Sequence, residues 1–218
     1  IVFSFLLMQA APGGPFQTER GVPPEVLANL EAKYGLDQPL PVQIWRYVAG
    51  VVTAFDFGPS FYYKDQSVND IIAQGFPVTL TYGFWSFVVA VTVGVSLGVM
   101  AAVYHNSWLD YLAVGVSVGA QVLPNFVMAP ILVLIFTLWL GWLPGGGWQG
   151  GQWQYIIMPV IALSTSFMAS IARITRSSML EVLNSGFIRT ARAKGLPMRR
   201  VVLRHALKPA MLPVISYL

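Results

Sequence analysis

Long uncharged apolar runs alternate with short polar segments along the chain. Three runs are complete, at residues 76–103, 111–140 and 155–172. As a helix the first is roughly 42 Å long, more than the ~30 Å hydrocarbon core of a bilayer, so it must tilt or project beyond that core. Residues 1–9 have the pattern of the end of an earlier span, and an apolar run begins at residue 209. We therefore expect an all-α integral membrane protein, here a piece with about five spans, the first and last incomplete.

The polar segments divide the spans. Residues 10–75 form the longest polar stretch before the first complete run. Within it, after two prolines, we expect a short amphipathic helix. Residues 104–110 are a tight polar turn, and residues 173–208 are a basic loop. The apolar side of the expected amphipathic helix consists of Val26, Leu27, Leu30 and Tyr34.

Charge is sharply segregated. Between Phe76 and Ala172 the sole charged residue is Asp110, whereas residues 173–208 hold nine Lys/Arg against one acid. Residues 10–75 carry four basic and seven acidic groups, a net charge of −3. Cytoplasmic loops retain Lys and Arg, so we expect 173–208 in the cytoplasm and 10–75 in the periplasm of a multi-pass inner-membrane protein. This segregation argues against a nucleic-acid binder.

A soluble helical core is the alternative to a membrane protein. Charged residues make up only 10% of the chain, where soluble domains have about 25%. Four tryptophans on either side of the glycine-rich loop favour a membrane interface. They are Trp139, Trp142, Trp148 and Trp153.

The sequence shows no catalytic constellation. His105 and His205 stand alone, without carboxylate pairs or metal-ligand spacing, and the serines of the last complete span lack a nearby activating base. The run Gly145–Gly147 lacks the Gly-Lys-Ser/Thr of a phosphate-binding loop. We expect a non-enzymatic chain that holds no cofactor and no metal ion.

The third span has polar groups and prolines near its middle. Gln and Asn are costly in lipid, and proline frees backbone carbonyls, so this face should turn toward protein or an aqueous path. A purely structural kink is an equal alternative. Small polar residues of the next span would pack helices together or share that path. The candidate path residues are Gln121, Pro124, Asn125, Ser166 and Ser170.

The basic loop contains a second candidate site. We expect the last complete span to continue as a helix until Gly186 terminates it. A short helix over 187–194 follows, with Phe187, Ala191 and Lys194 on one side and Ile188 and Arg192 beside them. It is too short to be stable alone. It would insert into a groove of a partner or lie on anionic lipid headgroups, and spacing favours neither.

At this loop the chain resembles the membrane subunits of binding-protein-dependent ABC importers. Their motif is Glu-Ala-Ala, a Gly after three residues, and an Ile-x-Leu-Pro element after nine more. Thr190, Ala191 and Gly195 match the first part in register, with Arg189 in place of the Glu. Leu207 matches the second part, and Pro209 comes one residue late.

Across essentially all 218 residues the chain is similar to the B-type subunits of oligopeptide importers. Segments such as PPEVLANLEAKYGLDQP, DFGPSF and LPGGGWQGG carry this likeness. The resemblance implies an ABC type-1 transmembrane domain over 76–218. Its implied partners are a second homologous permease subunit, two cytoplasmic ATPase subunits and a periplasmic peptide-binding protein.

The resemblance also implies a role for the loop. The short helix would be a coupling helix that docks in an ATPase cleft and drives alternating access along a path of which this chain forms half. The implied coupling-loop residues are Phe187, Ile188, Arg189, Thr190, Ala191, Arg192, Ala193, Lys194, Gly195, Leu207 and Pro209. Importers of dipeptides, nickel chelates or glutathione within the same family are alternatives, as is a non-transporting membrane anchor.

Overall fold

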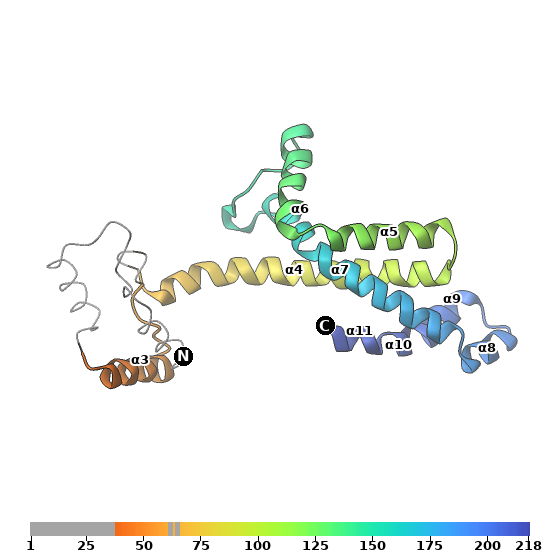
Figure 1. Cartoon of the computed structure of the whole chain (residues 1–218), viewed down its shortest axis with the longest axis horizontal. Helices are drawn as coiled ribbons and strands as arrows, with labels where there is room; N and C mark the ends of the chain where they lie inside the picture. Colours follow the sequence, from red (N-terminus) through yellow and green to blue (C-terminus); the bar gives the residue numbers. More distant parts are fainter. Residues whose placement is uncertain (1–37, 61–62, 64–65) are drawn as a thin grey trace. The chain divides into compact units, whose positions relative to one another are not determined.

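The computed structural model describes residues 38–60, 63 and 66–218, which divide after Pro77 into two units (Figure 1). The expected span end at 1–9 and the amphipathic helix of Val26, Leu27, Leu30 and Tyr34 lie outside the described residues.

The first unit contains helix α3 (Leu40–Ala54) and the start of α4 (Val68–Val103). Asn69 joins them, because its amide accepts from the Phe57 N–H at 2.8 Å and donates to the Phe55 carbonyl at 2.6 Å. The start of α4 is fixed by a reciprocal capping box. The Ser67 N–H donates to the Asp70 carboxylate at 3.0 Å, and the Asp70 N–H donates to the Ser67 hydroxyl oxygen at 3.1 Å. The helix therefore begins eight residues before the expected span at 76.

In the second unit α4 crosses α7 (Trp153–Leu183) at very short distance. A Cβ added to Gly98 would lie 2.5 Å from the Ala172 carbonyl oxygen, and one added to Gly94 would lie 2.8 Å from that of Met168. Both glycines are buried, as are Ala90, Ala101 and Ala102 of the same helix. Small residues at this spacing let two helix backbones approach closely inside a membrane.

The expected third span is sharply bent. Helix α5 (Trp108–Val122) is followed by α6 (Asn125–Leu132) and the π-helical segment η1 (Val133–Trp139). Between α5 and the segment formed by α6 and η1 the helix axis bends by 106°. Leu123, which precedes Pro124, has the extended φ of −80° and ψ of 114° that a following proline imposes. The bend thus falls at Pro124 and Asn125, two of the candidate path residues, whereas Pro130 lies inside α6.

The C-terminal part folds back along α7 in short helices (Figure 1). The prediction that Gly186 ends the preceding helix is wrong, because α7 ends at Leu183 and Gly186 begins α8. Residues 184 and 185 form the reversal, in which the Ser185 N–H donates to the Val182 carbonyl at 3.0 Å. The helices are α8 (Gly186–Ala193), α9 (Met198–Arg200), η3 (Val201–Ala206), α10 (Leu207–Ala210) and α11 (Leu212–Tyr217), and the loop before α7 holds the 3-10 turn η2 (Gln149–Gly151).

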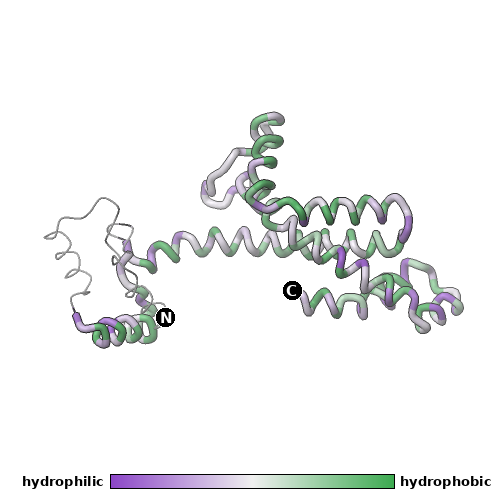
Figure 2. The backbone as a smooth tube through the Cα atoms, in the orientation of Figure 1, coloured by the Kyte–Doolittle hydropathy of each residue, from purple (hydrophilic) through white to green (hydrophobic). Residues whose placement is uncertain are grey.

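By length and composition, α4 and α7 could each cross a membrane, and α5 with α6 and η1 makes a third span if the bent pair is one. Green, apolar stretches dominate these helices, while purple, polar positions gather around α8 and α9 (Figure 2). The core of this unit follows α7. In its N-terminal part Met158 and Ala162 pack with Leu132, and near its middle Ile171 packs with Ala90 and Val214. At its C-terminal end Met179 and Leu183 pack with α8, η3 and α10.

Candidate functional site

Helix α8 is anchored on its own chain by one face. Ile188 is fully buried and Ala191 is 9% exposed, and both pack with Met179 and Leu183 of α7. Phe187, in contrast, is 52% exposed. The helix begins and ends one residue before the expected 187–194. Ile188 and Ala191 are the two residues that it buries within the chain. The exposed side presents Phe187, Arg189, Thr190, Arg192, Ala193 and Lys194.

Gly195 closes α8 in a Schellman motif. Its N–H donates to the Arg192 carbonyl at 2.9 Å, and the Leu196 N–H donates to the Ala191 carbonyl at 3.3 Å. The φ of Gly195 is +78°, a left-handed conformation, and open space surrounds the position of a Cβ. The backbone conformation therefore favours glycine here.

Leu207 and Pro209 lie on or beside the same cluster. Leu207 is partly buried against it, and Ala206 and Ala210, which flank the pair, are fully buried in it. The two halves of the sequence motif, separated by eleven residues between Gly195 and Leu207, thus meet around the end of α7.

The Schellman motif yields a stability prediction. Gly195→Ala should lower the free energy of unfolding by about 1–2 kcal/mol, because an L side chain is strained at positive φ. Gly195→Asn should cost less, since Asn tolerates this conformation. Gly186→Ala in the same helix, which meets nothing within 4 Å, is the matched control. Thermal unfolding midpoints of the purified variants test the order, and equal midpoints for the two alanine variants would contradict it.

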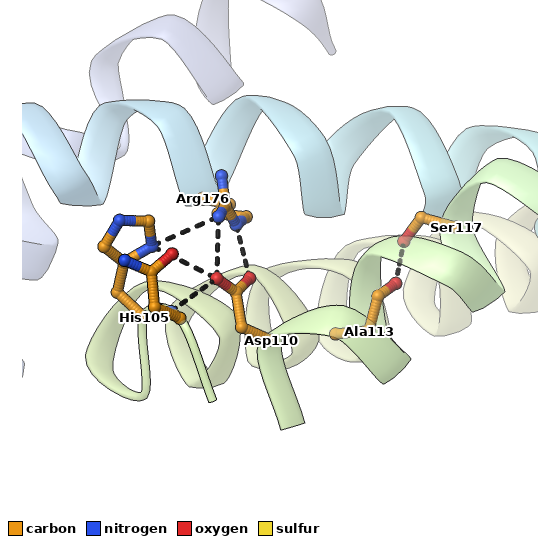
Figure 3. Close-up of polar contacts among 6 residues, drawn as sticks. His105, Asp110, Ala113, Ser117 and Arg176 are labelled. Atoms are coloured by element: carbon orange, nitrogen blue, oxygen red, sulfur yellow. Dashed lines mark hydrogen bonds and ion pairs between the residues drawn. The ribbon is translucent and has the colours of Figure 1, made fainter. Parts of the chain in front are cut away.

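A buried ion pair ties α5 to α7 at the start of the basic loop. The Arg176 Nε donates to Asp110 Oδ1 at 2.6 Å and its Nη2 donates to Oδ2 at 2.7 Å (Figure 3). His105 Nδ1 lies 3.1 Å from Asp110 Oδ2 and 3.2 Å from Arg176 Nη2. The Asn106 N–H donates to the same carboxylate at 3.0 Å. We call His105, Asp110 and Arg176 the ion-pair cluster.

The expectation that His105 stands alone is wrong, because its partners come from the turn it belongs to and from a helix 71 residues away. The signal in the sequence was Asp110 itself. A single acid at the edge of a span requires a partner. Nine Lys/Arg in the following loop were candidates, and only the packing of α7 on α5 selects Arg176.

Gln121, Asn125 and Ser166, three of the candidate path residues, hydrogen-bond across the contact between α7 and the bent α5–α6 segment. The Arg173 Nη1 donates to the Gln121 side-chain carbonyl at 2.8 Å, and the Ser166 hydroxyl donates to that of Asn125 at 3.1 Å. Ser170 donates to the Ser166 carbonyl at 3.2 Å. We call these five residues the polar seam. Pro124 produces the bend beside them and makes no polar contact of its own to α7 in the described residues.

The seam contains Arg173, which the sequence placed at the start of the cytoplasmic loop. Among the described residues there is no group of three or more His, Cys, Asp or Glu positioned to hold a metal ion.

Two parts of the chain match known families of membrane components. Residues 94–218 match the binding-protein-dependent transport system inner membrane component, and residues 1–83 match the N-terminal part of such components. The first match covers more than half of the chain. The chain belongs to this family. It is thus a multi-pass inner-membrane permease component with the all-α fold of an ABC type-1 transmembrane domain, and the resemblance seen in the motif is confirmed.

Its relatives within the family are named for the transport of different substrates. The chain is 56% identical over 218 residues to the oligopeptide transport system permease protein OppB of Escherichia coli K12, covering 100% of the chain and 71% of that protein. It is 44% identical over 215 residues to the dipeptide transport system permease protein DppB of Bacillus subtilis, covering 99% and 69%. It is 39% identical over 217 residues to the glutathione transport system permease protein GsiC of Salmonella paratyphi A, covering 99% and 70%.

Proposed function

We propose that the chain is the membrane-spanning permease subunit of an ATP-driven oligopeptide importer, that it forms half of the translocation path, and that it couples ATPase closure to alternating access. One observation carries the coupling role. Helix α8 is fixed to the end of α7 through Ile188 and Ala191 and leaves Phe187 exposed among basic residues. An exposed aromatic side chain on a helix that also exposes several cationic side chains is suited to bind in a groove on a partner protein.

The orientation is part of the proposal. Residues 173–208 face the cytoplasm and residues 10–75 the periplasm, in accordance with the charge count. The partners are then two cytoplasmic ATPase subunits at α8, a second homologous permease subunit and a periplasmic peptide-binding protein. Hydrolysis belongs to the ATPases, and this chain acts as a transmitting element without a cofactor. Membrane lipid contacts the exposed apolar faces.

Transmission follows the contacts of α7. Arg176 lies seven residues, roughly 10 Å along the helix, from the Leu183 end on which α8 is packed. A displacement of α8 therefore moves α7, and the ion pair to Asp110 carries the movement to α5. The chain is the two-state element, biased by nucleotide on one side and by the loaded binding protein on the other.

The polar seam supplies the path. Gln121 and Asn125 are exposed side chains on helices that cross the bilayer, where polar groups facing lipid are costly. This cost is removed when these side chains face the second permease subunit across an aqueous path. Arg173, at the start of the cytoplasmic segment, donates to Gln121. The 106° bend at Pro124 places Asn125 beside Ser166.

The substrate class rests on the 56% identity to OppB, above that to the dipeptide and glutathione relatives. In proteoliposomes containing the complete transporter, uptake of a labelled tripeptide should require ATP and binding protein. Unlabelled tetrapeptides should compete more strongly than dipeptides, glutathione or nickel chelates. Stronger competition by one of the latter three would reassign the substrate within the family. Absence of ATP-dependent uptake of all four classes would favour a membrane anchor.

A further inference from the structure

An open-sided pocket of about 330 Å³ lies between α4, α5 and α7. That volume is at the small end of ligand pockets, which are about 300–1,000 Å³. Its walls are mostly apolar, with Leu97 and Ala101 from α4 and Val114 and Val118 from α5. Its polar lining is formed by Ser117, Gln121, Arg173, Arg176 and Ser177.

The two arginines of the pocket differ in charge balance. Arg176 is neutralised by Asp110 through two hydrogen bonds of 2.6 and 2.7 Å. Arg173 has no ion pair within the described residues, and its Nη1 donates to the uncharged side chain of Gln121. The pocket thus holds one positive charge that no acid in the described residues balances, and Arg173 is exposed at its open side. A monoanion with an apolar body would pair with this guanidinium and contact the apolar walls, so the pocket is suited to such a ligand.

We infer that Arg173, with Gln121 beside it, binds the C-terminal carboxylate of the peptide in transit. This inference rests on the proposed function. A transporter of peptides with varied side chains needs to contact what they share, and every unmodified peptide ends in a carboxylate. The planar guanidinium of arginine matches a carboxylate with two parallel hydrogen bonds.

The neighbouring groups suit a peptide end. The Gln121 amide offers both a donor and an acceptor to the last peptide bond. The apolar walls accept the final side chain without specifying its identity. Arg173 also continues the polar seam through Gln121 toward the middle of the spans, where Asn125 bonds to Ser166. A phospholipid headgroup would supply the same charge, and the experiment below separates the two sources.

The test compares a peptide with its C-terminal amide in proteoliposomes of the complete transporter. Any preference of the binding protein is the same for every permease variant, so a change in the acid-to-amide uptake ratio originates in the permease. With Arg173→Gln we expect the acid-to-amide uptake ratio to fall at least about tenfold, as expected for the loss of a charge-assisted hydrogen bond to the free acid. Arg173→Lys should retain an intermediate preference and serves if the Gln variant does not assemble.

Arg200→Gln is the matched control, since Arg200 is exposed in the same basic loop and has no ion pair in the described part of the chain. An equal fall for acid and amide, or an unchanged ratio in both Arg173 variants, would overturn the inference. A third outcome would also overturn it: uptake by the Arg173 variants no longer depends on anionic phospholipid, while the acid-to-amide uptake ratio is preserved. That outcome would assign the site to a lipid headgroup. A wild-type transporter that takes up neither acid nor amide would instead refute the proposed function.

Discussion

Arg176→Met is expected to abolish transport while the protein still inserts into the membrane. The substitution leaves the Asp110 carboxylate, only 2% exposed, with the Asn106 N–H and His105 as its remaining partners. Removing one partner of a buried ion pair costs about 3–5 kcal/mol. Asp110→Asn should be milder, because the Arg176 side chain is 27% exposed and can be hydrated. Uptake and thermal unfolding of the purified complex measure both effects.

Pairing the two changes separates the interaction from the individual residues. An Asp110→Leu/Arg176→Met double variant carries no buried charge and should recover stability relative to Arg176→Met, since an apolar replacement of a buried pair is often neutral. Arg200→Met removes a cation from the same loop without breaking an ion pair and should behave as wild type. If Arg176→Met and Arg200→Met lose the same stability and uptake, the ion-pair cluster has no role in holding α5 to α7.

Gly98→Ala is expected to be the most damaging alanine substitution in α4. The added Cβ would lie 2.5 Å from both the Ala172 carbonyl oxygen and the Thr175 Cβ, and the backbone oxygen cannot rotate away. The two helices must separate, which should cost about 1–3 kcal/mol or more. Gly94→Ala, with a closest approach of 2.8 Å, should follow the same direction with a smaller effect.

Gly83→Ala is the matched control for these two glycines. It lies in the same helix, where an added Cβ meets nothing within 4 Å, so its stability should equal or slightly exceed that of the wild type. Unfolding midpoints of the three variants in detergent give the order. Equal midpoints for Gly98→Ala and Gly83→Ala would contradict the close crossing of α4 and α7.

Local patterns predicted the elements better than their ends. The long apolar runs identified α4 and α7, and Pro124 identified the break after α5, because these features act within a few residues. The start of α4 was within reach of the same reasoning. Ser67 and Asp70 have the spacing of a capping box, which outweighs the apolar run that begins at 76.

Features that depend on tertiary contacts could not be predicted in the same way. The spacing of α8 allowed either Phe187 or Ile188 to face inward, and the choice is made by Met179 and Leu183 at the end of α7. Likewise, a lone Asp110 required a cation, yet sequence separation of 66 residues gave no means to choose Arg176. Gln121 and Asn125 were recognised as unsuited to lipid, whereas their partners on α7 depend on the packing of α5 and on the bend that follows it.

The most direct test of the coupling role is a cysteine cross-link from the exposed face of α8. The 218 residues contain no cysteine, so Thr190→Cys introduces their single thiol at an exposed position, and Ala191→Cys places it one residue away on the buried face. In inverted vesicles with the ATPase subunits, Thr190→Cys should cross-link to an ATPase with a yield that changes on ATP addition, and Ala191→Cys should not. A Thr190→Cys thiol that is labelled from the cytoplasmic side but never cross-links would contradict the docking of α8 and leave a basic loop on lipid.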